Sequence, residues 1–234
     1  MKLSFVIPAY NEEDYIGDCL RSILEESSGK DYGIEIIVIN NASFDKTKEV
    51  ACSFEDVRVV DEARKGLTRA RQRGLEEARG EFLAYLDADT RITSGWFDII
   101  EQKLFNNNDI VCYSGPYRYY DGSKYQKTIL EFLWNISAPI AYMIVGFMVL
   151  GGNFVARKEA LKKMGGFDTD IEFYGEDTDV ARRISKFGKS VFDMDFFVYS
   201  SSRRFSEQGM VRISWKYAAN FIWQVLFHKP YTNE

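Results

Sequence analysis

The hydrophobic positions in the first ninety residues fall into two kinds of stretch that alternate along the chain. Mostly apolar runs, which are typical of strands, occupy residues 2–7, 34–39, 57–60 and 82–86, and the last run is apolar throughout, as in a strand buried on both faces. Stretches with helical spacing separate these runs, as at residues 16–24. Strands that alternate with helices in this way predict βαβ units, and therefore an α/β fold with a mostly parallel sheet flanked by helices.

The second half of the chain is less regular. We expect strands at residues 110–113 and 154–156 and helices at residues 96–104, 177–187 and 210–227. The chain contains no internal repeat, low-complexity tract or linker. A single domain with two functional halves is therefore predicted.

The exit from the first strand carries local signals for where elements begin and end. Pro8 is expected to end the strand, because proline cannot donate to a sheet ladder. Asn11 is expected to cap the next helix, whose first turn would contain Glu12, Glu13 and Asp14 and would complement the helix dipole.

Composition narrows the function classes. The net charge of -5 and the pI near 5.2 argue against a nucleic-acid-binding protein, which would show a basic excess. Cys19, Cys52 and Cys112 have no metal-ligand spacing and lie among apolar residues, so we expect reduced thiols in the core and a cytoplasmic protein. The apolar run 3–7 is too short for the core of a signal peptide.

Two aspartates follow the last strand of the first half. Asp87 and Asp89 stand directly after the apolar run 82–86, at the carboxyl end where ligands of parallel sheets bind. Carboxylates at this spacing can converge on one hard cation that also bridges diphosphate oxygens. The alternative interpretation of this Asp-x-Asp pair is a solvated turn or a helix cap.

Several motifs occur in an order that is similar to a known family. These are Val6-Ile7-Pro8-Ala9-Tyr10-Asn11-Glu12, the loop 40–45, Lys65-Gly66-Leu67-Thr68-Arg69-Ala70-Arg71, Asp87-Ala88-Asp89, Gly151-Gly152-Asn153 and Gly175-Glu176-Asp177. Together they resemble the inverting, family 2 type of GT-A glycosyltransferase, over roughly residues 3–190.

The resemblance implies a GT-A, Rossmann-like fold and the transfer of a sugar from a nucleotide-diphosphate donor to an acceptor hydroxyl. It divides the single domain 1–234 into a nucleotide-sugar-binding half (1–90), an acceptor-binding half (91–200) and a C-terminal amphipathic helix (201–234). It also implies a divalent metal, Mn²⁺ or Mg²⁺, held by Asp89 and Asp87.

The expected donor-binding residues come from both halves. They are Pro8, Ala9, Tyr10, Glu12, Asn40, Arg71, Asp87, Ala88, Asp89, Arg203 and Arg204. The Arg71 guanidinium could fork onto diphosphate oxygens, and the paired Arg203 and Arg204 could neutralise the leaving diphosphate. Each of these interpretations has a structural alternative. Pro8 to Glu12 could simply end a strand, Arg71 could be an ordinary surface arginine, and Arg203 and Arg204 could lie in a solvated basic turn.

The catalytic residues are expected at the start of a later helix. Glu176 and Asp177 stand where that helix begins, which favours their ionised state and suits a general base. We assign the base to Asp177 and expect Glu176 to orient the acceptor or brace the loop, whereas simple helix capping is the alternative. Gly151, Gly152 and Asn153 are the expected acceptor-binding residues.

One departure from the family pattern leaves other functions open. Asn40 stands where the family usually has an aspartate that contacts the donor base, so donor identity is not fixed. A non-catalytic nucleotide-sugar-binding protein is therefore one alternative. A nucleotidyltransferase is another, although Pro8-Ala9-Tyr10-Asn11 is not the Gly-rich phosphate loop that such an enzyme needs.

An apolar stretch at residues 129–150 is a candidate for contact with a membrane or a partner. Glu131, Asn135, Ser137 and Pro139 interrupt it, which is unfavourable for a spanning helix. A helix in the membrane interface, a buried helix and a homodimer contact all remain open. The acceptor is accordingly a sugar or a lipid-linked molecule, at the cytoplasmic face of a membrane in the second case.

Overall fold

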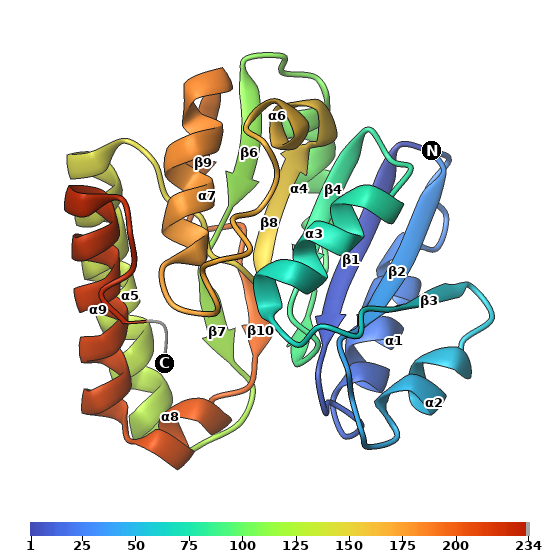
Figure 1. Ribbon diagram of the computed structural model, residues 1–234, viewed down its shortest axis with the longest axis horizontal. Helices are drawn as coiled ribbons and strands as arrows, with labels where there is room; N and C mark the ends of the chain where they lie inside the picture. The colour runs from blue at the N-terminus through green and yellow to red at the C-terminus, as the bar shows by residue number, and fades with distance from the viewer. Residues whose placement is uncertain (233–234) are drawn as a thin grey trace.

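A computed structural model describes residues 1–232, apart from the side chain of Leu133. Four parallel strands form one part of its main sheet, in the order β3-β2-β1-β4 (Figure 1). Helices α1, α2 and α3 connect successive strands of this part, as the sequence predicts. The elements are β1 (Leu3–Ala9), α1 (Ile16–Ser27), β2 (Ile34–Asn40), α2 (Thr47–Cys52), β3 (Val57–Asp61), α3 (Leu67–Glu77) and β4 (Phe82–Leu86).

The second half extends this sheet through an antiparallel strand. β8 (Asn153–Arg157) lies between β4 and β6 (Ile110–Ser114) and runs antiparallel to both, while β9 (Lys189–Phe192) pairs in parallel with β6. Among the described residues the main sheet thus has seven strands, ordered β3-β2-β1-β4-β8-β6-β9. The prediction of a mostly parallel sheet flanked by helices is confirmed.

A second, three-stranded sheet was missed by the sequence reasoning. It has the order β5-β10-β7 and consists of β5 (Thr90–Arg91), β7 (Tyr117–Tyr119) and β10 (Val198–Ser200). These strands have two or three residues each, too few for a periodic pattern. The small sheet holds the chain that follows Asp89 against the chain that precedes Arg203.

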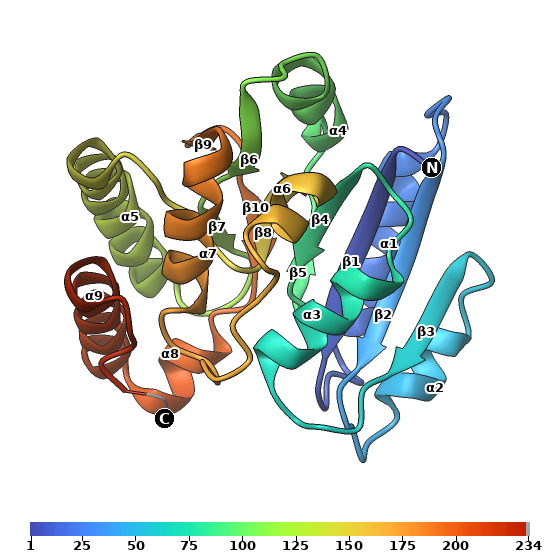
Figure 2. The same ribbon diagram turned by 45° about the horizontal axis from the view of Figure 1, so that its top comes forward.

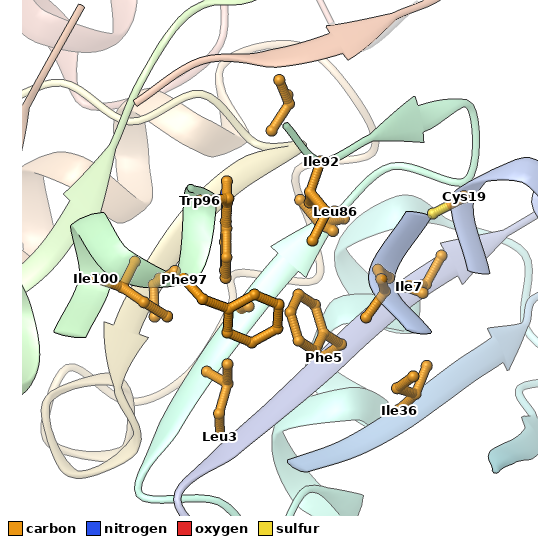
Figure 3. Close-up of a cluster of buried hydrophobic side chains, with 14 of the residues drawn as sticks. Leu3, Phe5, Ile7, Cys19, Ile36, Leu86, Ile92, Trp96, Phe97 and Ile100 are labelled. Atoms are coloured by element: carbon orange, nitrogen blue, oxygen red, sulfur yellow. The ribbon is translucent and has the colours of Figure 1, made fainter. Parts of the chain in front are cut away.

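Helices cover both faces of the main sheet (Figures 1 and 2). On one face α1 and α4 (Trp96–Ile100) pack against alternate residues of β1, and the rings of Phe5 and Trp96 lie 5.3 Å apart (Figure 3). On the other face α3 packs against the intervening residues, such as Val6, while α6 (Lys158–Lys163) and α7 (Glu176–Ile184) pack against β8 and β6. Because both faces of β1 are buried, its residues are apolar except for Ser4.

Two expectations for the first strand exit are wrong. β1 continues through Pro8 to Ala9, since its pairing with β4 ends at Val6 and no ladder bond toward β4 is lost at the proline. Asn11 does not cap a helix: it has a left-handed φ of 55°, and its side-chain oxygen accepts from the Phe44 N–H at 3.0 Å. Helix α1 therefore begins later, at Ile16.

The cysteines are free, but they are not all buried. Cys19 and Cys112 lie in the core, as expected, whereas Cys52 is exposed. Cys52 is the last residue of the short helix α2, whose buried residues are Thr47 and Ala51. The expectation of a core thiol is wrong at this position, because the helix ends on its solvent side.

The C-terminal half places two long helices at one end of the molecule. α5 (Lys124–Val145) is capped by the Ser123 side chain, which accepts from the Gln126 N–H at 3.1 Å, and ends at Gly146 with a left-handed φ of 76°. Both ends of α5 thus lie five residues earlier in the chain than the ends of the apolar stretch 129–150. α9 (Met210–Phe227) follows the short α8 (Arg203–Gln208) and lies beside α5 in both views (Figures 1 and 2).

Three short segments complete the chain. A π-helical turn, Glu101–Phe105, continues α4, and a 3₁₀ turn, Ser185–Phe187, continues α7. The loop 167–175 leads into α7 and ends at Gly175, whose φ of 86° is a conformation that glycine adopts without strain. This loop and the N-terminus of α7 bring Glu176 and Asp177 to the sheet.

Candidate functional site

The exits of β1 and β4 meet at one edge of the main sheet because the two strands are parallel neighbours. The β4 exit is the turn Asp87-Ala88-Asp89, which is closed by a hydrogen bond from the Thr90 N–H to the Asp87 carbonyl at 3.0 Å. The β1 exit brings Glu12 to the same place, since Glu12 and Asp89 share the ion partner Arg203. Glu12 and Asp89 therefore lie close to one guanidinium group.

Asp87 is held by three neighbours from different elements. Its Oδ1 lies 3.4 Å from Arg71 Nη2, and its Oδ2 accepts from the Tyr117 hydroxyl at 3.2 Å. That hydroxyl in turn accepts from the Gly152 N–H at 2.8 Å. A Cβ on Gly152 would lie 2.2 Å from Asp87 Oδ2, so a glycine is required for this close approach.

Asp89 is more deeply buried than Asp87 and pairs with an arginine. Its Oδ2 lies 3.3 Å from Arg203 Nη2, and Arg203 also forms a close ion pair with Glu12. Burial and the charge of Asp87 raise the pKa of Asp89 to about 7, against the opposing effect of Arg203. Burial likewise raises the pKa of Glu12, so this edge favours a cation.

The donor set at this edge fits a hard divalent cation that also binds substrate oxygens. The described residues contain no group of three or more His, Cys, Asp or Glu side chains that could hold a metal by themselves. Mg²⁺, however, is usually held by one or two carboxylates together with substrate phosphates. Asp87 and Asp89 supply such carboxylates, and Glu12 Oε2 is buried without a hydrogen-bond partner among the described residues.

Arg71 connects this edge to α7. Its side chain is buried, and its guanidinium lies between Asp87 and Glu176, with Nη1 3.2 Å from Glu176 Oε1. A Cβ on Gly151 would lie 2.5 Å from Arg71 Nη2, so Gly151 makes room for the guanidinium. Arg71 thus bridges two protein carboxylates, and its contact with a diphosphate stays a prediction.

Glu176 and Asp177 differ in exposure. Glu176 is buried, and its burial together with the charge of Asp177 raises its pKa to about 8. Asp177 is half-buried; burial raises its pKa, and the hydrogen bond from the Thr178 N–H at 2.7 Å opposes this rise. At both acids burial therefore opposes the effect of the helix N-terminus on the pKa.

The β2 exit contains an acid that the sequence reasoning missed. Asn40, the last residue of β2, donates from Nδ2 to Asp61 Oδ1 at 2.8 Å, and Asp61 also pairs with Lys48 at 2.6 Å. The parallel register of β2 and β3 sets Asn40 opposite Asp61. A carboxylate therefore lies beside the amide that stands in place of the family's usual aspartate.

Tyr10 has an aromatic and cationic environment at the same edge. Lys65 Nζ lies 3.9 Å from the centroid of the Tyr10 ring, and the exposed Phe44 packs edge-to-face on that ring at 6.1 Å. Asn41, which the sequence reasoning did not single out, fixes this region by donating to the carbonyls of Glu62 and Arg64. Rings and amides here suit a planar base.

Several other predicted site residues are buried beneath the sheet edge at which β1 and β4 end. Ala9 and Ala88 are buried at the two strand exits, and Pro8 lies within β1. Asn153 has no exposed surface: its amide donates to the carbonyls of Gly115 and Phe196 at 3.1 and 2.7 Å. The acceptor contact expected of Asn153 is therefore replaced by a structural role.

Arg204 and two cavities lie around this centre. Arg204 donates to the Tyr217 hydroxyl at 2.7 Å and lies over the Phe173 ring. A cavity of about 210 Å³ beneath α5 borders Tyr117, Trp134 and other residues of α5 and β7. Another cavity, of about 650 Å³, lies near β9 and the end of α5, away from the carboxylates, and we assign it no part in the site.

Comparison with known proteins identifies relatives of this arrangement. The model of the family described as "Glycosyl transferase family 2" matches residues 4–165. The chain is 32% identical to the uncharacterized glycosyltransferase EpsJ of Bacillus subtilis (strain 168) over 114 residues, which are 47% of this chain and 32% of that protein. The chain thus spans about a third of the length of this curated relative.

Two solved structures share the fold at low sequence identity. The mannosyltransferase PcManGT from Pyrobaculum calidifontis, in complex with GDP-Man and Mn²⁺, has a TM-score of 0.68 and 20% identity, covering 96% of this chain and 62% of its own. Glucosyl-3-phosphoglycerate synthase from Mycobacterium tuberculosis, with Mn²⁺, UDP-Glc and phosphoglyceric acid, has a TM-score of 0.62 and 20% identity, covering 96% and 79%. The predicted GT-A fold is confirmed.

Proposed function

Because the chain belongs to glycosyl transferase family 2, we propose that it transfers a sugar from a nucleotide-diphosphate-sugar to an acceptor hydroxyl, with inversion at the anomeric carbon. The observation that carries this proposal is the Arg71 bridge. One buried guanidinium contacts Asp87 on the donor side and Glu176 beside Asp177 on the acceptor side. The two sets of carboxylates are therefore parts of one site.

The donor occupies the edge formed by the exits of β1, β2 and β4. Tyr10 and the Asn40–Asp61 pair face the nucleoside, because an aromatic ring and paired amide and carboxylate groups recognise a base by stacking and hydrogen bonds. Asp87 and Asp89 face the diphosphate. Glu12, with its unpartnered oxygen, faces the ribose or the cation.

A divalent metal is part of the proposed donor complex. Relatives of the same fold were solved with Mn²⁺ or Mg²⁺, and the Asp87 and Asp89 oxygens fit such an ion. When bound, the ion would neutralise charge that develops on the leaving diphosphate. Arg203 and Arg204 would add to that neutralisation, since both guanidinium groups interact electrostatically with Asp89.

Asp177 is the proposed general base. Inversion requires the acceptor hydroxyl to attack from the face opposite the diphosphate, so the group that takes its proton lies across the sugar from Asp89. Asp177 belongs to the other half of the chain and is the more exposed of the two acids at the start of α7. Glu176, buried against Arg71, holds the start of α7 in place.

The acceptor is a sugar or a lipid-linked hydroxyl on the α5 and α7 side of the site. Tyr117, whose hydroxyl holds Asp87, also lines the cavity beneath α5, so an acceptor there would lie next to the donor. The buried, free Cys19 and Cys112 agree with a reducing, cytoplasmic setting.

The experiment that tests this function is release of nucleoside diphosphate from a panel of nucleotide sugars, with and without Mn²⁺. We expect slow metal-dependent hydrolysis of one donor, and a thermal shift that corresponds to about 2.7 kcal/mol at 100 times its dissociation constant. Asp89→Ala should abolish both and leave the fold intact. Pyrophosphate release in the presence of a nucleoside triphosphate and a sugar phosphate would instead identify a nucleotidyltransferase, and donor binding without release would identify a binding protein.

A further inference from the structure

Helix α9 buries polar side chains and exposes apolar ones. Its buried face carries the polar Asn220 and Gln224 besides the apolar Ile213. Val211, Trp215, Ile222 and Leu226 share the opposite face, at positions that helical spacing aligns, and expose between 54% and 82% of their surface. A helix that only packed on its own core would have the opposite arrangement.

The orientation of α9 is fixed by its polar face. Gln224 donates to Asp179 of α7 at 3.4 Å, and Asn220 Oδ1 accepts from the N–H groups of Tyr231 and Thr232 at 2.9 and 3.1 Å. Rotating the helix to bury its apolar stripe would break these bonds inside the protein, where unpaired polar groups are costly. The stripe of α9 therefore faces outward as part of the fold.

Helix α5 lies beside α9 (Figure 2) and carries a similar apolar stripe. Ile136, Ile140 and Met143 share one face and are 46%, 49% and 79% exposed, whereas Ala138 and Trp134 face the protein. Among the described residues, twelve of the seventeen exposed large hydrophobic side chains lie on α5 and α9. Apolar exposure gathered in this way marks an interaction surface.

The charge of this surface identifies its partner. α5 and α9 together contain four basic side chains and one acidic side chain, a net charge of +3 in a chain whose net charge is -5. Exposed Lys124 and Arg212 stand near the beginnings of the two helices. A two-fold dimer would press this patch against its own copy and oppose like charges, whereas a bilayer with anionic lipids complements both the apolar stripes and the basic groups.

We propose that the outward face of α5 and α9, defined by Ile136, Ile140, Met143, Trp215, Ile222 and Leu226, docks in the interface of an anionic lipid bilayer. α5 lies in the plane of the membrane and does not cross it. Although α5 is long and apolar enough to span a bilayer, both of its ends return to the same domain. Near its start the Gln126 amide donates to the Ser206 hydroxyl at 3.5 Å, and the Tyr142 hydroxyl near its end donates to the Ser190 carbonyl at 3.1 Å.

Docking in this orientation holds the site next to the lipid surface. α9 packs on α7, and Gln224 of α9 lies beside Gly175, which immediately precedes Glu176 and Asp177. The docking surface does not depend on the sugar-transfer chemistry. It can therefore be tested on the protein without any donor or acceptor.

The test is flotation with vesicles of phosphatidylcholine alone and of phosphatidylcholine with a quarter phosphatidylglycerol, at low and high salt. We expect flotation with the anionic vesicles that weakens in high salt. Trp215→Ser with Leu226→Ser should remove most of it. Lys124→Glu with Arg212→Glu should weaken the partition coefficient at least about tenfold, since each basic group near an anionic surface contributes about fivefold.

Phe44→Ser provides the matched control, because Phe44 is 82% exposed but lies in the loop before α2, a helix on the side of the molecule away from α5 and α9 (Figure 1). It should float like the wild type. Circular dichroism and the thermal midpoint of each variant establish that the fold is retained. A wild-type protein that stays in the soluble fraction at low salt would overturn the proposal, as would equal loss of flotation in the control. A concentration-dependent dimer that Trp215→Ser dissociates, without flotation, would assign the surface to a second copy instead.

Discussion

Arg71 in α3 and Glu176 in α7 are 105 residues apart in the sequence, and their side chains form a buried ion pair with Nη1 3.2 Å from Oε1. The same guanidinium lies 3.4 Å from Asp87 at the exit of β4. A buried charge is costly unless it is paired, so Arg71 stabilises the ionised forms of Glu176 and Asp87. The contacts between the donor and acceptor halves thus include ion pairs as well as apolar packing.

The first prediction concerns the ion pairs of Arg71. Arg71→Met should lower the free energy of unfolding by about 3–5 kcal/mol, because it leaves Glu176 buried without its partner and removes one contact of the partly exposed Asp87. Urea denaturation at pH 8 measures the change. Arg73→Met is the control, since Arg73 on the same helix forms an exposed pair with Glu77, and its loss should cost less than about 1 kcal/mol.

A companion variant separates charge from packing. Arg71→Met combined with Glu176→Gln should recover part of the stability that Arg71→Met loses, because the second change removes one uncompensated acid. If Arg71→Met were as mild as Arg73→Met, the bridge would not hold the two halves together.

The second prediction concerns the chemical step. Asp177→Asn should lower kcat by about 10²–10⁴, the usual range for loss of a general base, and should leave donor affinity unchanged. Single-turnover kinetics and a donor titration measure the two quantities. Glu172→Gln, a change to an exposed acid in the loop before α7, should leave both unchanged. Near-normal turnover of Asp177→Asn would move the base elsewhere.

Local sequence signals were sufficient for the centre of the sheet. β4 was predicted because an apolar run is followed within three residues by two aspartates. The structure has β4 at Phe82–Leu86, followed by Asp87 and Asp89. The reversed face of α9 is also visible in the sequence as an amphipathic pattern. Which side of that helix faces outward is set by Asp179, far away along the chain.

Contacts that depend on register or on distant packing could not be predicted. The Asn40–Asp61 pair follows from the alignment of β2 with β3, and no local pattern specifies that alignment. Arg71 was expected to bind a diphosphate, since nothing near it in the sequence indicates that α7 would supply Glu176. Asn11 has the composition of a helix cap, but its bond to Phe44 holds it in a left-handed turn instead.

The third prediction is a pH dependence of turnover. A general base acts when deprotonated, so kcat should fall about tenfold per pH unit below the pKa of the acid pair at the start of α7. Burial raises the pKa of Asp177, and this fall should therefore begin above the ordinary aspartate range, which lies near 3.9. A pH profile of single-turnover rates measures it. A profile that stays flat down to the ordinary aspartate range would contradict the prediction.

Glu176→Gln should leave the acidic fall in place. Burial and the charge of Asp177 raise the pKa of Glu176 to about 8, so Glu176 is protonated on the acidic side of the profile and carries no charge there that the substitution could remove. Glu172→Gln should leave the fall in place as well. A profile that moves in Glu176→Gln would mean that Glu176, and not Asp177, is the group that titrates in the wild type.

The last prediction uses the close approach of the main chain to Asp87. A Cβ on Gly152 would lie 2.2 Å from Asp87 Oδ2 and 2.5 Å from the Tyr117 hydroxyl, so Gly152→Ala should push the Asp87 carboxylate from its position. We expect donor affinity in the presence of Mn²⁺ to fall at least about tenfold, with a loss of about 1–3 kcal/mol in stability from overpacking. Calorimetric titration with the donor measures the affinity. Gly17→Ala is the control, because a Cβ there would meet only ordinary contacts and should leave donor affinity unchanged. Equal affinities of Gly152→Ala and the wild type would show that Asp87 is not needed for donor binding.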